Sequence, residues 1–199
     1  MARAFAEIAF TPSVLAAQAR QGSDRIYSRL LGDGPRTGNL IGPAEAAFVR
    51  ERFGFYQATT SETGWPYVQF RGGPAGFLKV IDAGTLAYAD FRGNRQYISV
   101  GNLSADGRVA LILLDYATRR RLKVWGVAHL SDDPDVIAAL HPTGYDARPE
   151  RAVVIAVSAV DWNCPQHIPE MVLRSEVNAE LHALQSRITE LETALGQRA

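Results

Sequence analysis

This sequence of 199 residues has few cysteines, no excess of charge and no long hydrophobic run, and each absence excludes a class of protein. It has a single cysteine, Cys164, so no disulfide can form within the chain and no zinc site can draw on two thiolates. It has no excess of charge, because 21 lysines and arginines balance 21 aspartates and glutamates. A general nucleic-acid binder needs a basic surplus to displace counterions, so we expect no nucleic-acid partner. The cysteine usage favours a reducing, cytoplasmic setting.

Long hydrophobic runs are also missing. The longest is Ala152–Val160, which is nine residues long and includes Ser158, whereas a membrane-spanning helix needs about 20. The first residues include an early acid, Glu7, and lack the apolar stretch of a secretory signal. We therefore expect no membrane association. With 47% hydrophobic and 21% charged residues, the composition is that of an ordinary globular protein.

Helix caps and turn residues divide the chain into three parts. Residues 1–54 are predicted to be a helical segment packed on a barrel, with proline at the first helical position after Thr11 and after Gly42. Residues 55–170 are predicted to be the barrel domain. Its expected strands are 55–60, 66–71, 77–82, 85–91, 97–100, 109–114, 122–130 and 152–160, with one helix after Ser131.

This pattern predicts a mainly β protein of the α+β class, built on a six-stranded antiparallel split β-barrel. A barrel is favoured because closing a sheet removes its exposed edges. The continuous apolar run Val109–Leu114 is expected to be a central strand that is buried on both faces.

The third part, residues 175–197, is predicted to be a C-terminal helix. Its apolar residues recur at alternating spacings of four and three, the pattern of a coiled-coil seam over fewer than three heptads. They are Val177, Leu181, Leu184, Ile188, Leu191 and Leu195. Such a helix can lie on its own barrel or pair across a dimer, and the pattern alone leaves both open.

The segment Asp90–Tyr97 combines residue types that are suited to binding an anion. It comes directly after a predicted strand and combines Arg92 and Arg95 with Gly93 and the side-chain amides of Asn94 and Gln96. A glycine lets a phosphate approach the backbone closely, and guanidinium groups bind phosphate through two hydrogen bonds. The segment therefore indicates an anion site. The alternative interpretation is a solvated turn with arginines on its surface.

Several motifs in the same order resemble those of a known family. Residues 71–79, 93–98 and 162–168 are similar to the predicted flavin-nucleotide-binding branch of the pyridoxamine 5′-phosphate oxidase family. The resemblance runs from about residue 45 to 170. It implies a split-barrel homodimer that binds FMN at the subunit interface.

The resemblance also implies site residues. Lys79 and Arg95 fall on the family's phosphate-contacting lysine and arginine, and Arg121 falls where a glutamine reaches the flavin. The full set of implied cofactor-binding residues is Phe77, Leu78, Lys79, Arg92, Gly93, Asn94, Arg95, Gln96, Arg121, Trp162, Asn163, Gln166 and His167. The segment that holds the vitamin in the oxidases has no recognisable counterpart here, so the substrate stays unidentified.

The function predicted on this basis is an FMN-dependent oxidoreductase. No side chain stands out as a general acid or base, and no metal-ligand spacing is present. The alternatives are a non-catalytic flavin carrier or redox sensor, and a split barrel that binds haem or a deazaflavin. Cys164, beside Pro165, is expected to be a buried and unreactive thiol.

Overall fold

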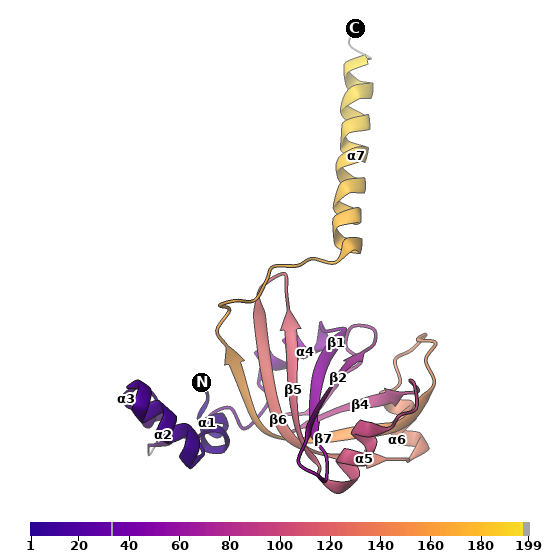
Figure 1. The fold of residues 1–199 in the computed structure, drawn as a ribbon. Coiled ribbons are helices and arrows are strands. Elements are labelled where there is room, and N and C mark those ends of the chain that lie inside the picture. Colours follow the sequence, from indigo (N-terminus) through magenta and orange to yellow (C-terminus); the bar gives the residue numbers. More distant parts are fainter. Residues whose placement is uncertain (33, 197–199) are drawn as a thin grey trace.

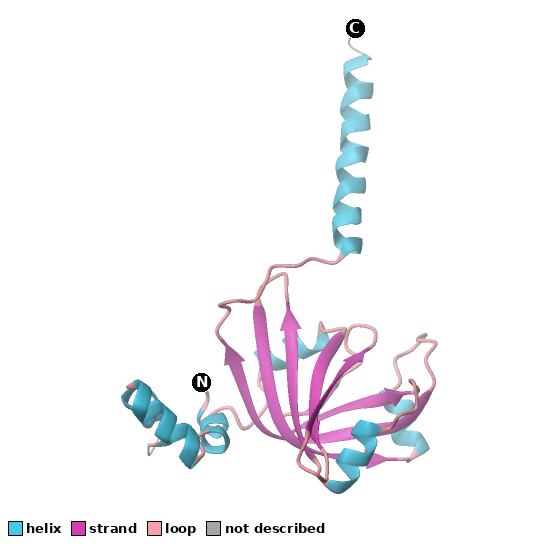
Figure 2. Cartoon of the chain, viewed as in Figure 1, coloured by secondary structure: helices cyan, strands magenta, loops and turns pink. Residues whose placement is uncertain are grey.

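A single antiparallel sheet organises the chain, whose computed structural model describes residues 1–32 and 34–196 (Figure 1; Figure 2). Its seven strands follow the order β2-β1-β5-β6-β7-β4-β3. They are β1 (Gly54–Thr60), β2 (Pro66–Gly72), β3 (Lys79–Asp82), β4 (Thr85–Phe91), β5 (Arg108–Asp115), β6 (Arg120–Ser131) and β7 (Pro149–Asn163). The sheet curves into a barrel that is split, because its edge strands β2 and β3 are not neighbours in this order.

Helices flank the sheet. They are α1 (Arg3–Ala9), α2 (Pro12–Gln21), α3 (Asp24–Tyr27), the 3₁₀ helix η1 (Ser28–Leu31), α4 (Pro43–Arg50), α5 (Ile98–Ala105), α6 (Pro134–Leu140) and α7 (Arg174–Gly196). Phe5 of α1 packs against Ala159 of β7, whereas α2 and α3 bury no residue. α7 extends away from the sheet, and position 197 of the predicted helix lies outside the described residues (Figure 1). None of the described helices is long and apolar enough to cross a membrane.

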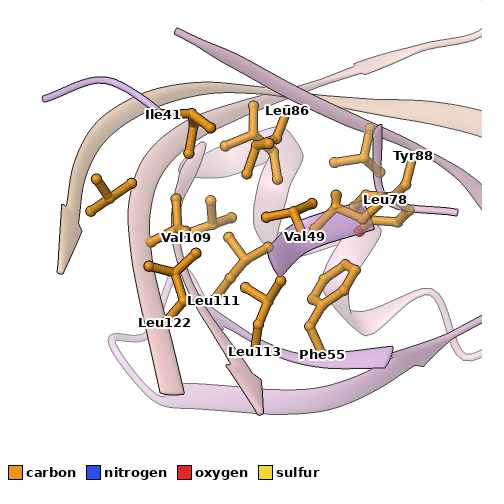
Figure 3. Packing of buried hydrophobic residues seen from close by; sticks show 14 of the residues in the cluster. Ile41, Val49, Phe55, Leu78, Leu86, Tyr88, Val109, Leu111, Leu113 and Leu122 are labelled. Carbon is orange, nitrogen blue, oxygen red and sulfur yellow. The ribbon is translucent and has the colours of Figure 1, made fainter. Parts of the chain in front are cut away.

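The hydrophobic core fills the barrel (Figure 3). Phe55 of β1 stacks on Phe77 with ring centroids 5.6 Å apart, and Tyr88 of β4 meets Phe55 edge-on. Leu111 and Leu122 close the core from β5 and β6. Burying aromatic and branched aliphatic side chains in this way is the dominant favourable term in folding.

The structure corrects two strand predictions. The sheet has seven strands rather than six, because every expected strand except 97–100 joins one sheet, including the edge strand β3 that pairs with β4. Residues 97–100 are not a strand but lead into α5. The reason is helical spacing: Ser99, Asn102 and Leu103 recur at i, i+3 and i+4, and all three are buried where α5 covers the barrel.

β5 departs from its prediction in a different way. Val109, Leu111 and Leu113 face the core as expected, but Ile112 on the opposite face is 38% exposed. Burial on both faces is therefore wrong for the single chain. We call this exposed outer side of the barrel the outer apolar face. Its exposed residues are Tyr56, Val68, Phe70, Ile112 and Val127, from β1, β2, β5 and β6.

Candidate functional site

The loop between β4 and α5 borders a small pocket of about 50 Å³. Gly93, Asn94, Arg95 and Gln96 line it from the loop. The other lining residues are Tyr67, Gln69 and Arg71 from β2, Asp90 and Phe91 from β4, Tyr97, Ile98, Ser99 and Val100 at the start of α5, and Glu150 from β7. The structure thus brings four of the predicted site residues together around one cavity.

The backbone of this loop is strained. Arg95 and Tyr97 have φ of 64° and 55°, in the left-handed region that residues with side chains rarely adopt. Each such residue costs about 1–3 kcal/mol, and such outliers gather at ligand sites. Tyr97 precedes α5, and its side chain makes no capping hydrogen bond to that helix. The N–H groups of the first turn of α5 are therefore suited to an anion.

Charged side chains cluster at this cavity: Arg71, Asp90 and Glu150 line it, and Arg92 and Arg151 contact those carboxylates from outside the lining. Arg71 lies 3.1 Å and Arg151 3.6 Å from the carboxylate of Asp90, while Arg92 lies 3.7 Å from Glu150. Burial raises the pKa of the Asp90 carboxyl, and the two guanidinium groups act in the opposite direction. With Arg95 included, four arginines face two carboxylates, so the surroundings of the pocket carry a positive excess.

One buried donor in this cluster lacks an acceptor. Among the described residues, Nε of Arg71 has no hydrogen-bond partner, whereas Nη1 of Arg151 lies 3.6 Å from the Asp90 carboxylate, just beyond hydrogen-bond distance. A buried unpaired donor is costly and is uncommon in folded proteins. An anionic oxygen in the pocket would satisfy Arg71, which lines it. The donor set therefore fits a phosphate group, whose oxygens accept hydrogen bonds from arginine and from backbone N–H groups.

Lys79, Phe77 and Leu78 lie apart from this cavity. Lys79 opens β3 opposite Ala87, and directly opposed residues of an antiparallel pair share one face of the sheet. Ala87 packs in the cluster under α6, so Lys79 faces that side, whereas Asp90 lines the pocket. Phe77 and Leu78 are 1% and 0% exposed and belong to the core. None of the three lines the pocket.

Trp162 lies at the opposite end of β7 and is held by its own chain. Its indole Nε1 donates a hydrogen bond of 2.6 Å to Glu45 of α4. Phe48 meets the ring edge-on with centroids 4.9 Å apart, and the guanidinium of Arg120 stacks at 4.4 Å. The indole is therefore fixed in position with its polar atom satisfied.

Arg121 and Asn163 face each other at this same end, in register across β6 and β7. With its amide oxygen turned towards Arg121, Asn163 accepts a hydrogen bond of 3.0 Å from Nε. Gln166 and His167 follow in the segment after β7, both exposed, and His167 has φ of 62°. Cys164 is exposed as well, so the expectation of a buried thiol is wrong.

The predicted site residues therefore form two groups at the two ends of β7. Pro149 pairs with Phe91 beside the loop, and Asn163 pairs with Arg121 at the other end. At about 3.3 Å per residue, fourteen steps of strand cover up to about 46 Å along the chain. The curvature of β7 shortens the direct distance, yet the strand crosses the sheet from one side to the other (Figure 1).

Residues that the sequence did not single out as ligands complete the pocket. Arg71 points inward because β2 alternates, and its neighbour on that face, Gln69, accepts a hydrogen bond of 3.2 Å from Ser99. Arg71 begins one of the motifs quoted above, but strand alternation shows its direction only once the register of β2 is known. The described residues hold no cluster of three or more histidine, cysteine, aspartate or glutamate side chains suited to a metal ion.

The fold is an antiparallel split barrel with an arginine-lined pocket at one end of its longest strand, β7. The sequence profile of the pyridoxamine 5′-phosphate oxidase family matches residues 41–164, and the chain belongs to that family. The match covers the sheet from before β1 to the end of β7, and so includes the predicted site residues up to Asn163 but not Gln166 and His167.

Solved structures with a similar chain include the following two. HupZ of Group A Streptococcus is 13% identical, covers 66% of this chain and 99% of its own, and superposes with a TM-score of 0.51. An FMN-binding protein from Syntrophomonas wolfei is 12% identical, covers 80% of this chain and 99% of its own, and has a TM-score of 0.49. No curated protein sequence matches the chain. At these identities the likeness concerns the fold alone.

Proposed function

We propose that this member of the family binds FMN and acts as a flavin-dependent oxidoreductase on a small molecule. The observation that carries the proposal is the pocket beside the loop, where Arg71 has a buried donor without an acceptor and α5 has an uncapped start. Both features suit the 5′-phosphate of the cofactor.

Within this proposal, Arg95 and Arg71 hold the phosphate from two sides of the pocket. The side chains of Asn94 and Gln96 add hydrogen bonds, and Gly93 leaves the backbone open to close approach, since a Cβ there would meet nothing within 4 Å. Arg92 contributes charge at the rim. The role of Lys79 stays a prediction, because its side of β3 is not the side of the pocket.

The flavin ring needs a second surface, and we place it on a partner subunit. The outer apolar face has no cover in the single chain, and apolar patches of this kind mark protein interfaces. A homodimer formed there would allow Arg121, Trp162 and Asn163 of one chain to lie near the loop of the other. Gln166 and His167 follow Asn163 and are assigned to the same ring site.

The bound flavin supplies hydride and electron transfer, and the protein supplies binding, orientation and electric field. In this proposal the guanidinium of Arg121 would stabilise negative charge on the flavin ring. Trp162 offers a fixed aromatic surface, since Glu45 and Arg120 hold it in place.

The hypothesis that the pocket binds the phosphate of FMN is tested by titrating the protein with FMN and with riboflavin, which lacks the phosphate. Arg95→Ala should weaken FMN binding by about 1.5–3 kcal/mol, the usual contribution of a hydrogen bond to a charged group. Riboflavin affinity should not change. Arg29→Ala is the matched control, because Arg29 is exposed on η1, on the opposite side of the molecule from α5 (Figure 1). Equal losses for both ligands would remove Arg95 from the phosphate site.

The hypothesis of an oxidoreductase is tested separately by measuring the steady-state rate at which the protein with FMN oxidises NADH or NADPH. An enzyme should turn over much faster than the same concentration of free FMN. A rate no greater than that of free FMN would instead identify a flavin carrier or sensor.

A further inference from the structure

The C-terminal helix α7 is the largest part of the molecule without a packing partner. It has 23 residues, a length of about 34 Å at 1.5 Å per residue. It stands clear of the sheet (Figure 1). Its apolar stripe is exposed along its whole length, from 37% at Val177 to 68% at Leu195. A helix of this kind is not stabilised by tertiary packing within its own chain.

The apolar stripe follows a heptad repeat. Val177, Leu184 and Leu191 occupy d positions, and Leu181, Ile188 and Leu195 occupy a positions. The positions farthest from this stripe are small or polar: Ala179, Ser186 and Thr193. A strict 3.5-residue period suits a narrow seam with another helix rather than the broader contact of a helix lying on a barrel.

We propose that α7 pairs in parallel with α7 of a second copy of this chain, as a short two-stranded coiled coil. Arg187 falls at a g position and Glu192 at the e position five residues later, the spacing that forms an ion pair between two parallel helices. The symmetry of the pair would form this bridge twice. In the single chain Arg187 contacts Glu190 instead, at 2.9 Å, and both side chains are about two-thirds exposed. Giving up such an exposed pair costs little.

The core positions bear on the number of strands. Ile188 at a lies between Leu184 and Leu191 at d, the combination that favours two strands in a parallel coiled coil, and Leu181 and Leu195 fill the other a positions. An antiparallel pair would set Glu180 against Arg187 and so would also balance charge. The parallel arrangement therefore rests on the spacing of Arg187 and Glu192, and crosslinking tests it.

The pairing has a consequence for the cofactor site, and this part rests on the proposed function. Fewer than three heptads form a weak coiled coil alone, but a second contact between two chains acts at high effective concentration. α7 would therefore keep the barrels together at concentrations where the outer apolar face alone would not. The composite flavin site would then persist on dilution.

Orientation is tested by oxidative crosslinking in a Cys164→Ser background. Val177→Cys and Leu191→Cys, fourteen residues apart, should each crosslink with itself. Ser186→Cys on the opposite face is the control and should not crosslink. Crosslinking only when the Val177→Cys and Leu191→Cys chains are mixed would show antiparallel helices and overturn the proposal. Crosslinking no greater than that of the control would overturn it too.

Strength is tested by sedimentation equilibrium of the full chain. Leu184→Asp with Ile188→Asp should raise the dimer dissociation constant on the order of 100-fold, whereas Ser186→Asp should not change it. Both stripe residues are more than half exposed, so the monomer should keep its thermal unfolding temperature. An unchanged dissociation constant would overturn the proposal. FMN binding at high protein concentration is measured in parallel: a protein that crosslinks through α7 but binds no FMN would retain this inference and lose the proposed function.

Discussion

The two ends of β7 are built in opposite ways. At the Pro149 end, Nε of Arg71 is a buried donor without a hydrogen-bond partner, and Arg95 and Tyr97 hold strained backbone conformations. At the Asn163 end, Trp162 is hydrogen-bonded to Glu45, and Asn163 accepts from Arg121 when its amide oxygen is turned towards it. Nε of Arg52, which lies over Phe48 at this end, is also buried and unpaired. The unpaired donor at the first end lines a pocket, whereas the aromatic ring at the second end is fixed by its neighbours.

This difference separates two ways in which a site can be prepared. A buried donor without an acceptor destabilises the protein when no ligand is bound. A ligand that accepts a hydrogen bond from that donor removes this cost, and the gain contributes to its affinity. An end whose side chains are fixed by their neighbours offers a rigid surface at little further entropy cost. A phosphate suits the first end and a flat aromatic ring suits the second.

The largest expected effect tests whether the Asn163 end is assembled for stability. Trp162→Ala should lower the free energy of unfolding by about 3 kcal/mol, because it removes a partly buried aromatic ring and leaves a cavity beside Phe48. Trp65→Ala is the control, since Trp65 is 76% exposed, and should change stability by less than about 0.5 kcal/mol. Urea unfolding measures both. Equal effects would show that the indole is not integrated into the fold.

The next effect concerns the ion pair at the other end and depends on pH. Arg71→Met should cost about 2 kcal/mol at pH 7, because it leaves the buried Asp90 carboxylate with Arg151 alone. Burial already raises the pKa of Asp90, and loss of Arg71 should raise it further. A carboxyl with a raised pKa takes up a proton more readily in the folded state, so the deficit should shrink as pH falls through that pKa.

Thermal unfolding at pH 7 and at pH 4.5 checks this sign. Arg71→Met with Asp90→Asn should lack the pH dependence, since no carboxyl is then left unpaired. A deficit that grows on acidification would show that Asp90 is not the group involved.

The smallest effect concerns Glu45, which joins α4 to β7 at the Asn163 end. One carboxylate oxygen accepts from the indole of Trp162, and the other accepts from the backbone N–H of Gly42 at 3.0 Å, where it closes the start of α4. Glu45→Gln should cost about 1 kcal/mol, because one charge-assisted bond becomes a neutral one. Chemical unfolding measures it, and FMN affinity should change less than with Arg95→Ala.

Local signals predicted much of this architecture from sequence. Thr85–Phe91 was predicted as a strand with its observed bounds, because Gly84 marks a turn and the side chains alternate. Proline after Thr11 predicts the start of a helix, and α2 begins at Pro12. The residues Gly93–Gln96 line one cavity, and their role as an anion site stays a prediction. Each of these features depends on residues close together in the chain.

The missing parts depend on contacts between distant segments. Arg71 could not be assigned to the pocket from sequence because its role requires β2 to lie near β4 across the split of the barrel. The separation of Arg121 and Trp162 from the loop was hidden because β7 was predicted to span 152–160, whereas the strand runs from 149 to 163. The continuous apolar run of β5 predicts that the strand contacts the core. Whether its other side is also buried depends on which element covers that side of the sheet, and this cannot be predicted from the run itself.

The most direct test of the account is a complementation of two defective chains. Arg95→Ala impairs the loop end, and Arg121→Ala impairs the other end, so each homodimer should bind FMN weakly. A heterodimer isolated with two different tags should contain one site with both defects and one site with neither. The account predicts one tight FMN site per heterodimer, with the wild-type dissociation constant. Heterodimers that bind no more tightly than their parents would contradict it, and would place the flavin site within a single chain.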